Sequence, residues 1–394
     1  MNYKLFTIGR IGALWLLWLV TGCIETFEPA VTPAAINFLV VDGYINTQGV
    51  TTIRLSRAVA LDKVGNTLVE SKARVYIEEE GGPQYPLAEG PAGTYTSAAL
   101  SLSNTSRVRL HLTTAAQKEY VSEFTQAIIT PAIDSVTWKT TAEGLQIAVN
   151  AQDKTDNLKF YRWEYVETWE FNSAFVSKLE YKNGKIQERT NAISHCWGNE
   201  ASTSIRLGTT EKLAQSVVSD APITLLPRNT PKLQLKYSIL VKQSALSREE
   251  YNYLDILRKN SQNIGSLYDP LPSQLTGNVQ CVSDREEVVI GFVGAHSVAE
   301  QRLFIDRTDL PATWPRATGY ETCILDTIPR PHAPPEDWPE LPEILGFFSP
   351  GYSIPVDVFE LNTSLGIKSF YLYSTPECVD CRKRGVTEKP AFWP

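Results

Sequence analysis

Hydrophobic and polar residues alternate along most of the chain in short runs that Gly and Pro interrupt. "INFLVVDGYI", "GVTTIRLSRAV" and "RVRLHLTTAAQKEYVSEF" alternate in this way, and Asp42-Gly43 is a turn signal. A period of two places successive side chains on opposite faces of a strand. Strands about 8 to 12 residues apart, with Gly and Pro turns, are typical of a β-sandwich. The pattern predicts a sandwich over residues 36–127, and we expect this segment to fold as an isolated fragment.

A second region of alternation begins after Pro131. "SVTWK", "LQIAV", "FYRWEYVETWEF" and "KLQLKYSILVKQSAL" come first, and "EVVIGFVGAHSV" and "QRLFIDR" follow further along. These runs are rich in β-branched and aromatic residues, which favour strands. They predict a second sandwich over residues 131–308, so the fold is mainly β, with two tandem β-sandwich domains of the immunoglobulin or transthyretin kind.

One segment of the second region has a helical period instead. Ser247 is a suitable N-cap and is followed three residues later by Glu250. Tyr251, Leu254 and Leu257 then recur at helical spacing. This pattern predicts a helical insertion over residues 248–263.

Residues 309–394 do not continue either pattern. Ten prolines lie between residues 309 and 355, and such a composition disfavours regular elements. We expect a long Pro-rich loop that wraps the surface, followed by a C-terminal tail that contains cysteines.

The N-terminal segment predicts membrane attachment. Lys4 and Arg10 precede an apolar core at residues 11–20 that is too short for a membrane span. Leu19-Val20-Thr21-Gly22-Cys23 resembles the bacterial lipobox, whose cysteine is acylated. We therefore expect a lipoprotein signal peptide over residues 1–22, lipid attached at Cys23 and a tether over residues 23–35. The alternative, a buried amphipathic helix, leaves the basic start and the switch to polar residues at Glu25 unexplained.

Charge narrows the classes of partner. The formal net charge is −7, and removal of residues 1–22 takes away Lys4 and Arg10 and no acid, which changes it to −9. Surfaces that bind nucleic acids need clustered Lys and Arg, and the sequence clusters them only at Arg382-Lys383-Arg384. We therefore expect no nucleic-acid partner.

The cysteines other than Cys23 are expected to form disulfides, which are the default in an oxidising envelope. There are five of them, so one remains unpaired; they are Cys196, Cys281, Cys323, Cys378 and Cys381. The preferred partner of Cys323 is Cys378 or Cys381, because that bridge closes the Pro-rich loop. Two alternatives are a thioredoxin-like pair at Cys378 and Cys381, which lacks its βαβ setting, and a zinc site that Cys323 and His332 would complete.

No catalytic constellation stands out in the sequence. The four histidines are scattered, and the nucleophile-elbow, phosphate-loop and dinucleotide motifs are missing. We predict no cofactor, no metal site and no enzymatic activity. The alternative is an envelope hydrolase acting on peptide or glycan, whose candidate carboxylates are those of Asp42, Asp153, Asp156 and Asp269.

The segment "GSLYDPLPSQLTGN", residues 265–278, is a candidate contact surface. It combines Gly and Pro with Tyr268, Leu271 and Asn278 and is too apolar for a merely solvated loop. It therefore predicts either a partner contact or a loop packed into the edge of the sandwich.

Taken together, these segments resemble the family of domain of unknown function 4249 (DUF4249). The resemblance rests on the lipobox and on the ordered segments "NFLVVDGYINTQGVTTIRLSRAVAL", "KYSILVKQSALSREEYNYLDIL", "GSLYDPLPSQLTGN" and "CVDCRKRGVTEKPAFWP". It implies a lipid-anchored outer-membrane protein of Bacteroidota, facing the periplasm or the cell surface. It further implies a non-enzymatic accessory or ligand-binding partner of a TonB-dependent transporter, with membrane lipid bound through Cys23 and with no established catalytic residue.

Overall fold

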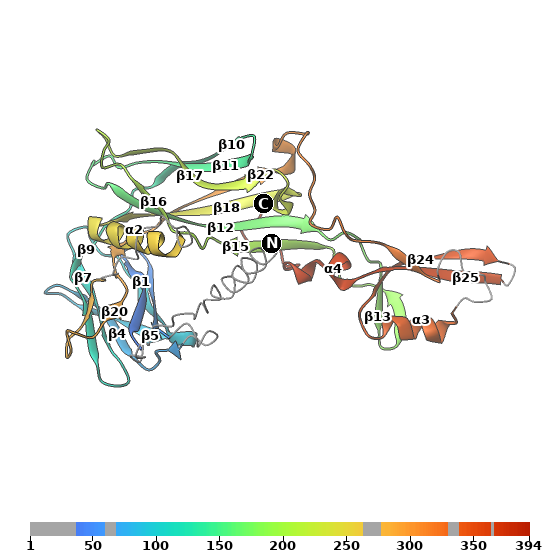
Figure 1. Ribbon diagram of the computed structural model, residues 1–394, viewed down its shortest axis with the longest axis horizontal. Coiled ribbons are helices and arrows are strands. Elements are labelled where there is room, and N and C mark those ends of the chain that lie inside the picture. Colours follow the sequence, from blue (N-terminus) through green and yellow to red (C-terminus); the bar gives the residue numbers. More distant parts are fainter. Residues whose placement is uncertain (1–36, 60–67, 263–276, 330–338, 364–365) are drawn as a thin grey trace, which may run out of the picture.

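The structure, a computed structural model, describes residues 37–59, 68–262, 277–329, 339–363 and 366–394. It is built mainly of strands, which confirms the prediction of a mainly β protein. Figure 1 shows a first sheet that carries β1, β4 and β7, a second layered body around β12 and β18, and an arm that ends in β24 and β25. Within the described ranges, no helix is both long and apolar enough to cross a membrane.

The first sheet contains most of the N-terminal strands and follows the order β19-β8-β7-β4-β5-β6-β2-β1-β20. The strands are β1 (Leu39–Asn46), β2 (Val50–Arg57), β3 (Leu68–Val69), β4 (Arg74–Glu79), β5 (Gln84–Glu89), β6 (Thr94–Ala99), β7 (Arg107–Thr113), β8 (Glu119–Ser122) and β9 (Thr125–Gln126), with the short 3-10 helix η3 (Pro91–Gly93). The predicted turn at Asp42-Gly43 is wrong: both residues lie inside β1, where Gly43 pairs with Ile53. Gly43 has a φ of 132° and lies close to the Thr52 carbonyl oxygen, so a side chain does not fit at this position.

This sheet curls around a single core. Along β7, Val108, Leu110 and Leu112 are buried and alternate with more exposed residues, as the period of two requires. Both edge strands of the sheet, β19 (Val279–Cys281) and β20 (Val289–Ile290), come from the same later segment of the chain.

The domain boundary expected from the sequence is therefore wrong for residues 279–296. β19 pairs with β8, β20 pairs with β1, and β21 (Ala295–His296) also pairs with β1. Val279, Val289 and Val293 are buried in the first core rather than in the second. Covering both edges in this way removes unpaired backbone groups that would otherwise be exposed.

Two connections between the first sheet and the second body run side by side. Ile128 forms a parallel bridge with His296. The Thr130 backbone N–H donates to Ser297 Oγ at 2.8 Å, and the Thr130 hydroxyl donates to the Ser297 carbonyl at 2.5 Å. Both side chains are buried, so the two connections form one hydrogen-bonded unit.

The second body is a sandwich of two sheets, in the orders β10-β11-β17 and β15-β12-β18-β22, with β16 also paired to β12. The strands are β10 (Ile133–Thr140), β11 (Gly144–Gln152), β12 (Phe160–Asn172), β15 (His195–Ala201), β16 (Arg206–Thr209), β17 (Val217–Pro227), β18 (Lys236–Leu246) and β22 (Ala299–Asp306), with the 3-10 helices η4 (Pro231–Leu233) and η5 (Arg307–Asp309). Leu145 and Ile223 from one sheet meet Trp163 and Tyr237 from the other in a common core.

The predicted helical insertion is confirmed as α2 (Arg248–Gln262). The Glu250 backbone N–H donates to Ser247 Oγ at 3.1 Å, as expected for an N-cap. Leu246, Tyr253 and Leu254 form a small cluster with Phe160 of β12. This contact holds the helix against one edge of the second sandwich (Figure 1).

The C-terminal region is not the wrapping loop that its prolines suggested. It forms the arm, whose three-stranded sheet has the order β23-β25-β24. Its elements, with those that pack beside them, are β13 (Leu179–Lys182), β14 (Lys185–Glu188), β23 (Asp326–Ile328), α3 (Leu341–Phe348), β24 (Ile354–Thr363), β25 (Gly366–Ser374), α4 (Pro376–Val379) and η7 (Cys381–Lys383). A small core of its own contains Ile193, Val356 and Val379.

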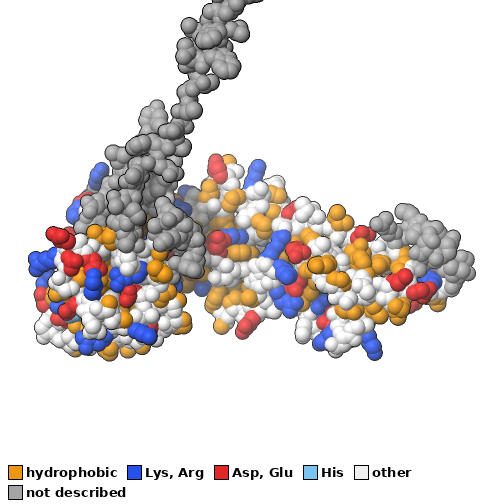
Figure 2. Space-filling view, turned by 60° about the horizontal axis from the view of Figure 1, so that its bottom comes forward, with side chains coloured by type: hydrophobic (Ala, Val, Ile, Leu, Met, Phe, Trp, Pro, Cys, Tyr) orange, Lys and Arg blue, Asp and Glu red, His pale blue; other side chains and the backbone are white. Residues whose placement is uncertain are grey.

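The arm also exposes apolar side chains. Phe359 is 40% exposed, Leu361 46% and Ile367 66%. Figure 2 shows the hydrophobic side chains on the surface of the arm, at the right of the view.

Two disulfides fasten the base of the arm. Cys196 of β15 bonds to Cys381, and Cys323 bonds to Cys378. Cys378 is one of the two partners expected for Cys323. The two cysteines of "CVDC" therefore bond to different partners and not to each other. Cys281 is the free cysteine among the described residues, and it is buried in the first core.

Candidate ligand-binding pocket

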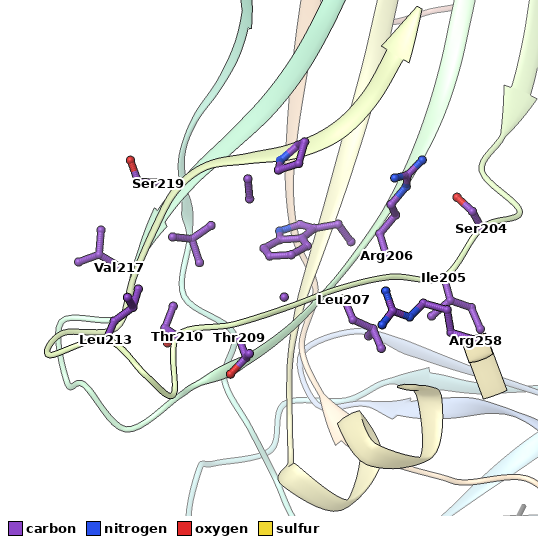
Figure 3. Close-up of a pocket in the computed structure, with 15 residues that line it drawn as sticks. Ser204, Ile205, Arg206, Leu207, Thr209, Thr210, Leu213, Val217, Ser219 and Arg258 are labelled. Carbon is purple, nitrogen blue, oxygen red and sulfur yellow. The ribbon is translucent and has the colours of Figure 1, made fainter. Parts of the chain in front are cut away.

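A pocket of about 470 Å³ opens at one edge of the second sandwich, between β16 of one sheet and β17 of the other (Figure 3). This volume lies within the range of about 300 to 1,000 Å³ that is usual for small-molecule sites. The lining residues come from β12, the segment just before β16, β16, β17, the loop between the last two strands, and α2. They are Trp163, Ser204, Ile205, Arg206, Leu207, Gly208, Thr209, Thr210, Leu213, Val217, Val218, Ser219, Ala221, Pro222 and Arg258.

An aromatic ring and a glycine form one wall of the pocket. Trp163 is 4% exposed, and its indole N–H donates to Gln243 Oε1 at 2.9 Å, which fixes the ring. Gly208 lies directly against this ring, and a Cβ there would come within 2.5 Å of Trp163 Cζ3. A side chain at position 208 would therefore push the ring out of place.

The loop that joins β16 to β17 is fixed by hydrogen bonds. The buried Ser216 hydroxyl lies 2.9 Å from Thr210 Oγ1, and the Ser216 backbone N–H donates to Asp156 Oδ1. Glu211 forms an ion pair with Arg248 at the start of α2. The pocket is therefore largely formed before any ligand enters.

Two arginines stand at the same end of the pocket, where Figure 3 also shows Ser204 and Ile205. Arg258 reaches from α2 toward Leu207, whereas Arg206 projects from β16. Arg258 Nη2 lies 2.5 Å from Asp255 Oδ1, while its Nε is buried without a hydrogen-bond partner. Arg206 is exposed, and no ion pair joins it to a described residue.

The chemistry of this lining suits binding. It offers guanidinium and hydroxyl donors beside apolar and aromatic surface, the usual composition of a ligand pocket. The described lining residues include no carboxylate and no imidazole, so the groups that most often transfer protons in catalysis are not among them.

The structure does not assemble the described carboxylates of the hydrolase hypothesis, those of Asp42, Asp153 and Asp156, into a cleft. Asp153 is buried and accepts hydrogen bonds from the backbone of Asn157 and Leu158 and from Thr155, so it organises a turn. Burial alone would raise the pKa of the Asp153 carboxyl, but hydrogen bonds from Leu158 and Thr155 hold that pKa below its ordinary value.

Of the other candidates that the structure describes, Asp156 belongs to the turn of Asp153 and Asp42 lies in the first sheet. Asp156 pairs with Lys159 at 2.6 Å in the same turn. Asp42 is exposed on β1 of the first sheet. Asp269 lies outside the described residues.

The predicted contact residues are placed only in part. Cys23, Tyr268 and Leu271 lie outside the described residues. Asn278 is 5% exposed; its amide donates to the Val293 carbonyl at 3.0 Å and accepts from the Val293 N–H at 2.8 Å. The suggestion that Asn278 contacts a partner is therefore wrong, because this amide replaces a backbone pairing inside the first core.

The described residues provide no site for the zinc alternative. No group of three or more His, Cys, Asp or Glu side chains within the described ranges could hold a metal ion. Cys323 and Cys378 are bonded to each other, and His332 lies outside the described residues.

The pocket residues were not found from the sequence, and only a weak signal pointed to them. Gly208 interrupts a short alternating run, which often marks a close approach. Trp163 and Arg258 lie in a strand and a helix that the sequence predicts, but nothing in the sequence shows that these elements meet.

Comparison with solved structures gives low similarity. A two-domain fibronectin type-III segment of chicken tenascin is 9% identical, covers 68% of this chain and 99% of that chain, and has a TM-score of 0.18. The adhesin InvE of Yersinia pseudotuberculosis is 12% identical, covers 54% of this chain and 57% of that chain, and has a TM-score of 0.15. Scores this low define no shared fold.

Sequence families give a clearer result. No curated protein matches the chain. The family model described as "Domain of unknown function (DUF4249)" matches residues 24–302, which include the first sheet, the pocket and α2. This match spans more than half of the chain, so the protein belongs to the DUF4249 family.

Proposed function

We propose that this protein is a non-enzymatic binding protein that takes a small ligand in the pocket between β16 and β17. The observation that carries the proposal is a preformed cavity of about 470 Å³ with an aromatic wall and hydrogen-bond donors. Its walls come from both sheets and from α2, so a ligand there would contact strands of both sheets and the helix.

A screen of small organic molecules by ligand-observed NMR tests this function. Ala221 is half-buried on the pocket wall, so Ala221→Phe should fill the cavity and weaken binding of pocket ligands about tenfold or more. Leu213→Trp narrows the other end, where the leucine is 54% exposed and replacement spares the core. Ala88→Phe, at an exposed position of β5, is the matched control and should leave binding unchanged. Ligands that bind both pocket variants as tightly as the parent would contradict the proposal.

We further propose that the protein is anchored in the outer membrane through Cys23 and assists a TonB-dependent transporter. Support comes from the lipobox-like sequence at residues 19–23 and from two disulfides, which suit an oxidising compartment. The exposed apolar side chains of the arm supply a surface of the kind that protein partners cover.

Replacement of the anchor residue tests this location. Cys23→Ala should leave a precursor of higher mass that no longer incorporates labelled palmitate, because the thiol is the attachment point. The same variant should lose co-purification of an identified TonB-dependent transporter from solubilised outer membrane. Cys281→Ala is the control, since that buried thiol lies in the first core. Continued palmitate labelling of Cys23→Ala would contradict the anchor.

A further inference from the structure

We infer that the ligand of this pocket is a small organic anion with an apolar body, and that its anionic group binds at Arg258. This inference rests on the proposed function, because it assigns a ligand class to the same pocket. It goes further in stating that charge, and not only shape, selects the ligand.

The local charge balance at Arg258 is positive. Asp255 is the carboxylate that pairs with Arg258, and it also pairs with Lys259 at 2.7 Å. Burial alone would raise the pKa of Asp255, but hydrogen bonds from Lys259 and Arg258 hold that pKa below its ordinary value. Two cations therefore share one carboxylate, which leaves about one unit of positive charge at this end of the pocket.

The donor fork of Arg258 is only partly used. A guanidinium presents five N–H donors in a planar arrangement that suits carboxylate, sulfonate or phosphate oxygens. Asp255 occupies Nη2, and the buried Nε has no hydrogen-bond partner. An anion at this position would meet guanidinium donors of the 39%-exposed Arg258 side chain that Asp255 does not occupy.

Arg206 adds a second positive charge at the same end of the pocket. It is exposed and forms no ion pair with a described residue, so its charge is not neutralised locally. Asp220, next to Ser219 in the sequence, is exposed and is not a lining residue. The positive pocket contrasts with a chain whose net charge is −7.

The rest of the lining accounts for the apolar body. Beyond Arg258, the pocket runs past Leu207 toward Val217 and Leu213 (Figure 3). The Trp163 ring also lines it. Aromatic and aliphatic surface of this kind gains free energy when it covers the apolar part of a ligand. The cavity therefore suits a molecule with one charged end and one apolar end.

Two probes that differ by one sulfonate group test the inference. Anilinonaphthalene sulfonate carries an aromatic body with a sulfonate, and N-phenylnaphthylamine is its neutral counterpart. Both would be titrated by fluorescence against the chain from residue 23 onward, with Cys23→Ser so that no lipid is attached. Because Leu213→Trp narrows the pocket, the fluorescence component that this variant removes reports pocket binding rather than binding to the arm.

Neutralising Arg258 should separate the two probes. Arg258→Gln is expected to weaken sulfonate binding about tenfold or more, because a charge-assisted hydrogen bond is lost. The neutral probe should keep its affinity within about twofold. Arg206→Gln, at an exposed residue without an ion pair to a described residue, should give a smaller loss without risk to the fold. Arg228→Gln, exposed after β17, makes the same change in charge away from the pocket and should leave both affinities unchanged.

The possible results distinguish the inference from the proposed function. Equal affinities of parent, Arg258→Gln and Arg206→Gln for the sulfonate would overturn the anion inference, while loss of both probes in Leu213→Trp would still support the pocket. Equal binding of both probes to Leu213→Trp and to the parent would overturn the proposed function itself.

Discussion

A fragment of residues 37–127 is expected to remain largely unfolded, contrary to the expectation from the sequence alone, because it lacks the strands that close both edges of its sheet. In the full chain, β19, β20 and β21 supply these edges. Their segment buries five side chains in the first core: Val279, Cys281, Val289, Val293 and Ala295. Each larger apolar side chain contributes about 1.5–3 kcal/mol on burial. The total approaches the stability of about 5–15 kcal/mol that is typical of a whole domain.

Circular dichroism and amide hydrogen exchange would measure this effect. Fusion of residues 277–298 to the fragment through a flexible linker should restore a cooperative unfolding transition. The same fusion with Val289→Asp and Val293→Asp is the control, since both valines are buried in the core. A cooperative transition of residues 37–127 alone would contradict the expectation.

Loss of the two disulfides should destabilise the molecule unequally. Removal of a native disulfide typically costs about 2–5 kcal/mol, and the loss increases with the length of the loop that the bridge closes. Cys196 and Cys381 are 185 residues apart, whereas Cys323 and Cys378 are 55 apart. By loop-closure entropy, Cys196→Ser with Cys381→Ser should cost about 1 kcal/mol more than Cys323→Ser with Cys378→Ser.

Urea unfolding of the two double variants, followed by hydrogen exchange in β24 and β25, would test this order. The first double variant should lose protection at the base of the arm, because it cuts the covalent tie between β15 and η7. Cys281→Ser serves as the control for loss of a sulfur without loss of a bridge. A greater loss of stability in the variant without Cys323 and Cys378 would contradict the entropic argument.

Local patterns in the sequence predicted the elements well. Alternation indicated the buried side of β7, and capping by Ser247 indicated the start of α2, because both signals depend on neighbours in the chain. These local patterns do not show to which sheet a strand belongs. The period of two shows which face of residues 279–296 is buried, but nothing in that period distinguishes the first core from the second.

The arm and the pocket could not be predicted from the sequence, for related reasons. Prolines between residues 309 and 355 disfavour regular structure locally, yet β24 gains its partners from β25 and its position from two distant disulfides. The pocket depends on Gly208 meeting Trp163 and on Arg258 reaching across from α2. These are contacts between residues far apart in the chain, and a single sequence does not encode them as a local pattern.

The paired connections at Thr130 and Ser297 bear on how the molecule responds to twisting. A domain that is joined to its neighbour by a single connection can rotate about the backbone bonds of that connection. Here, the two neighbouring connections are joined by hydrogen bonds, so rotation of the first sheet against the second sandwich would break buried hydrogen bonds. A torque applied to the first sheet should therefore be transmitted directly to the second sandwich. The mouth of the pocket should then rotate together with the first sheet.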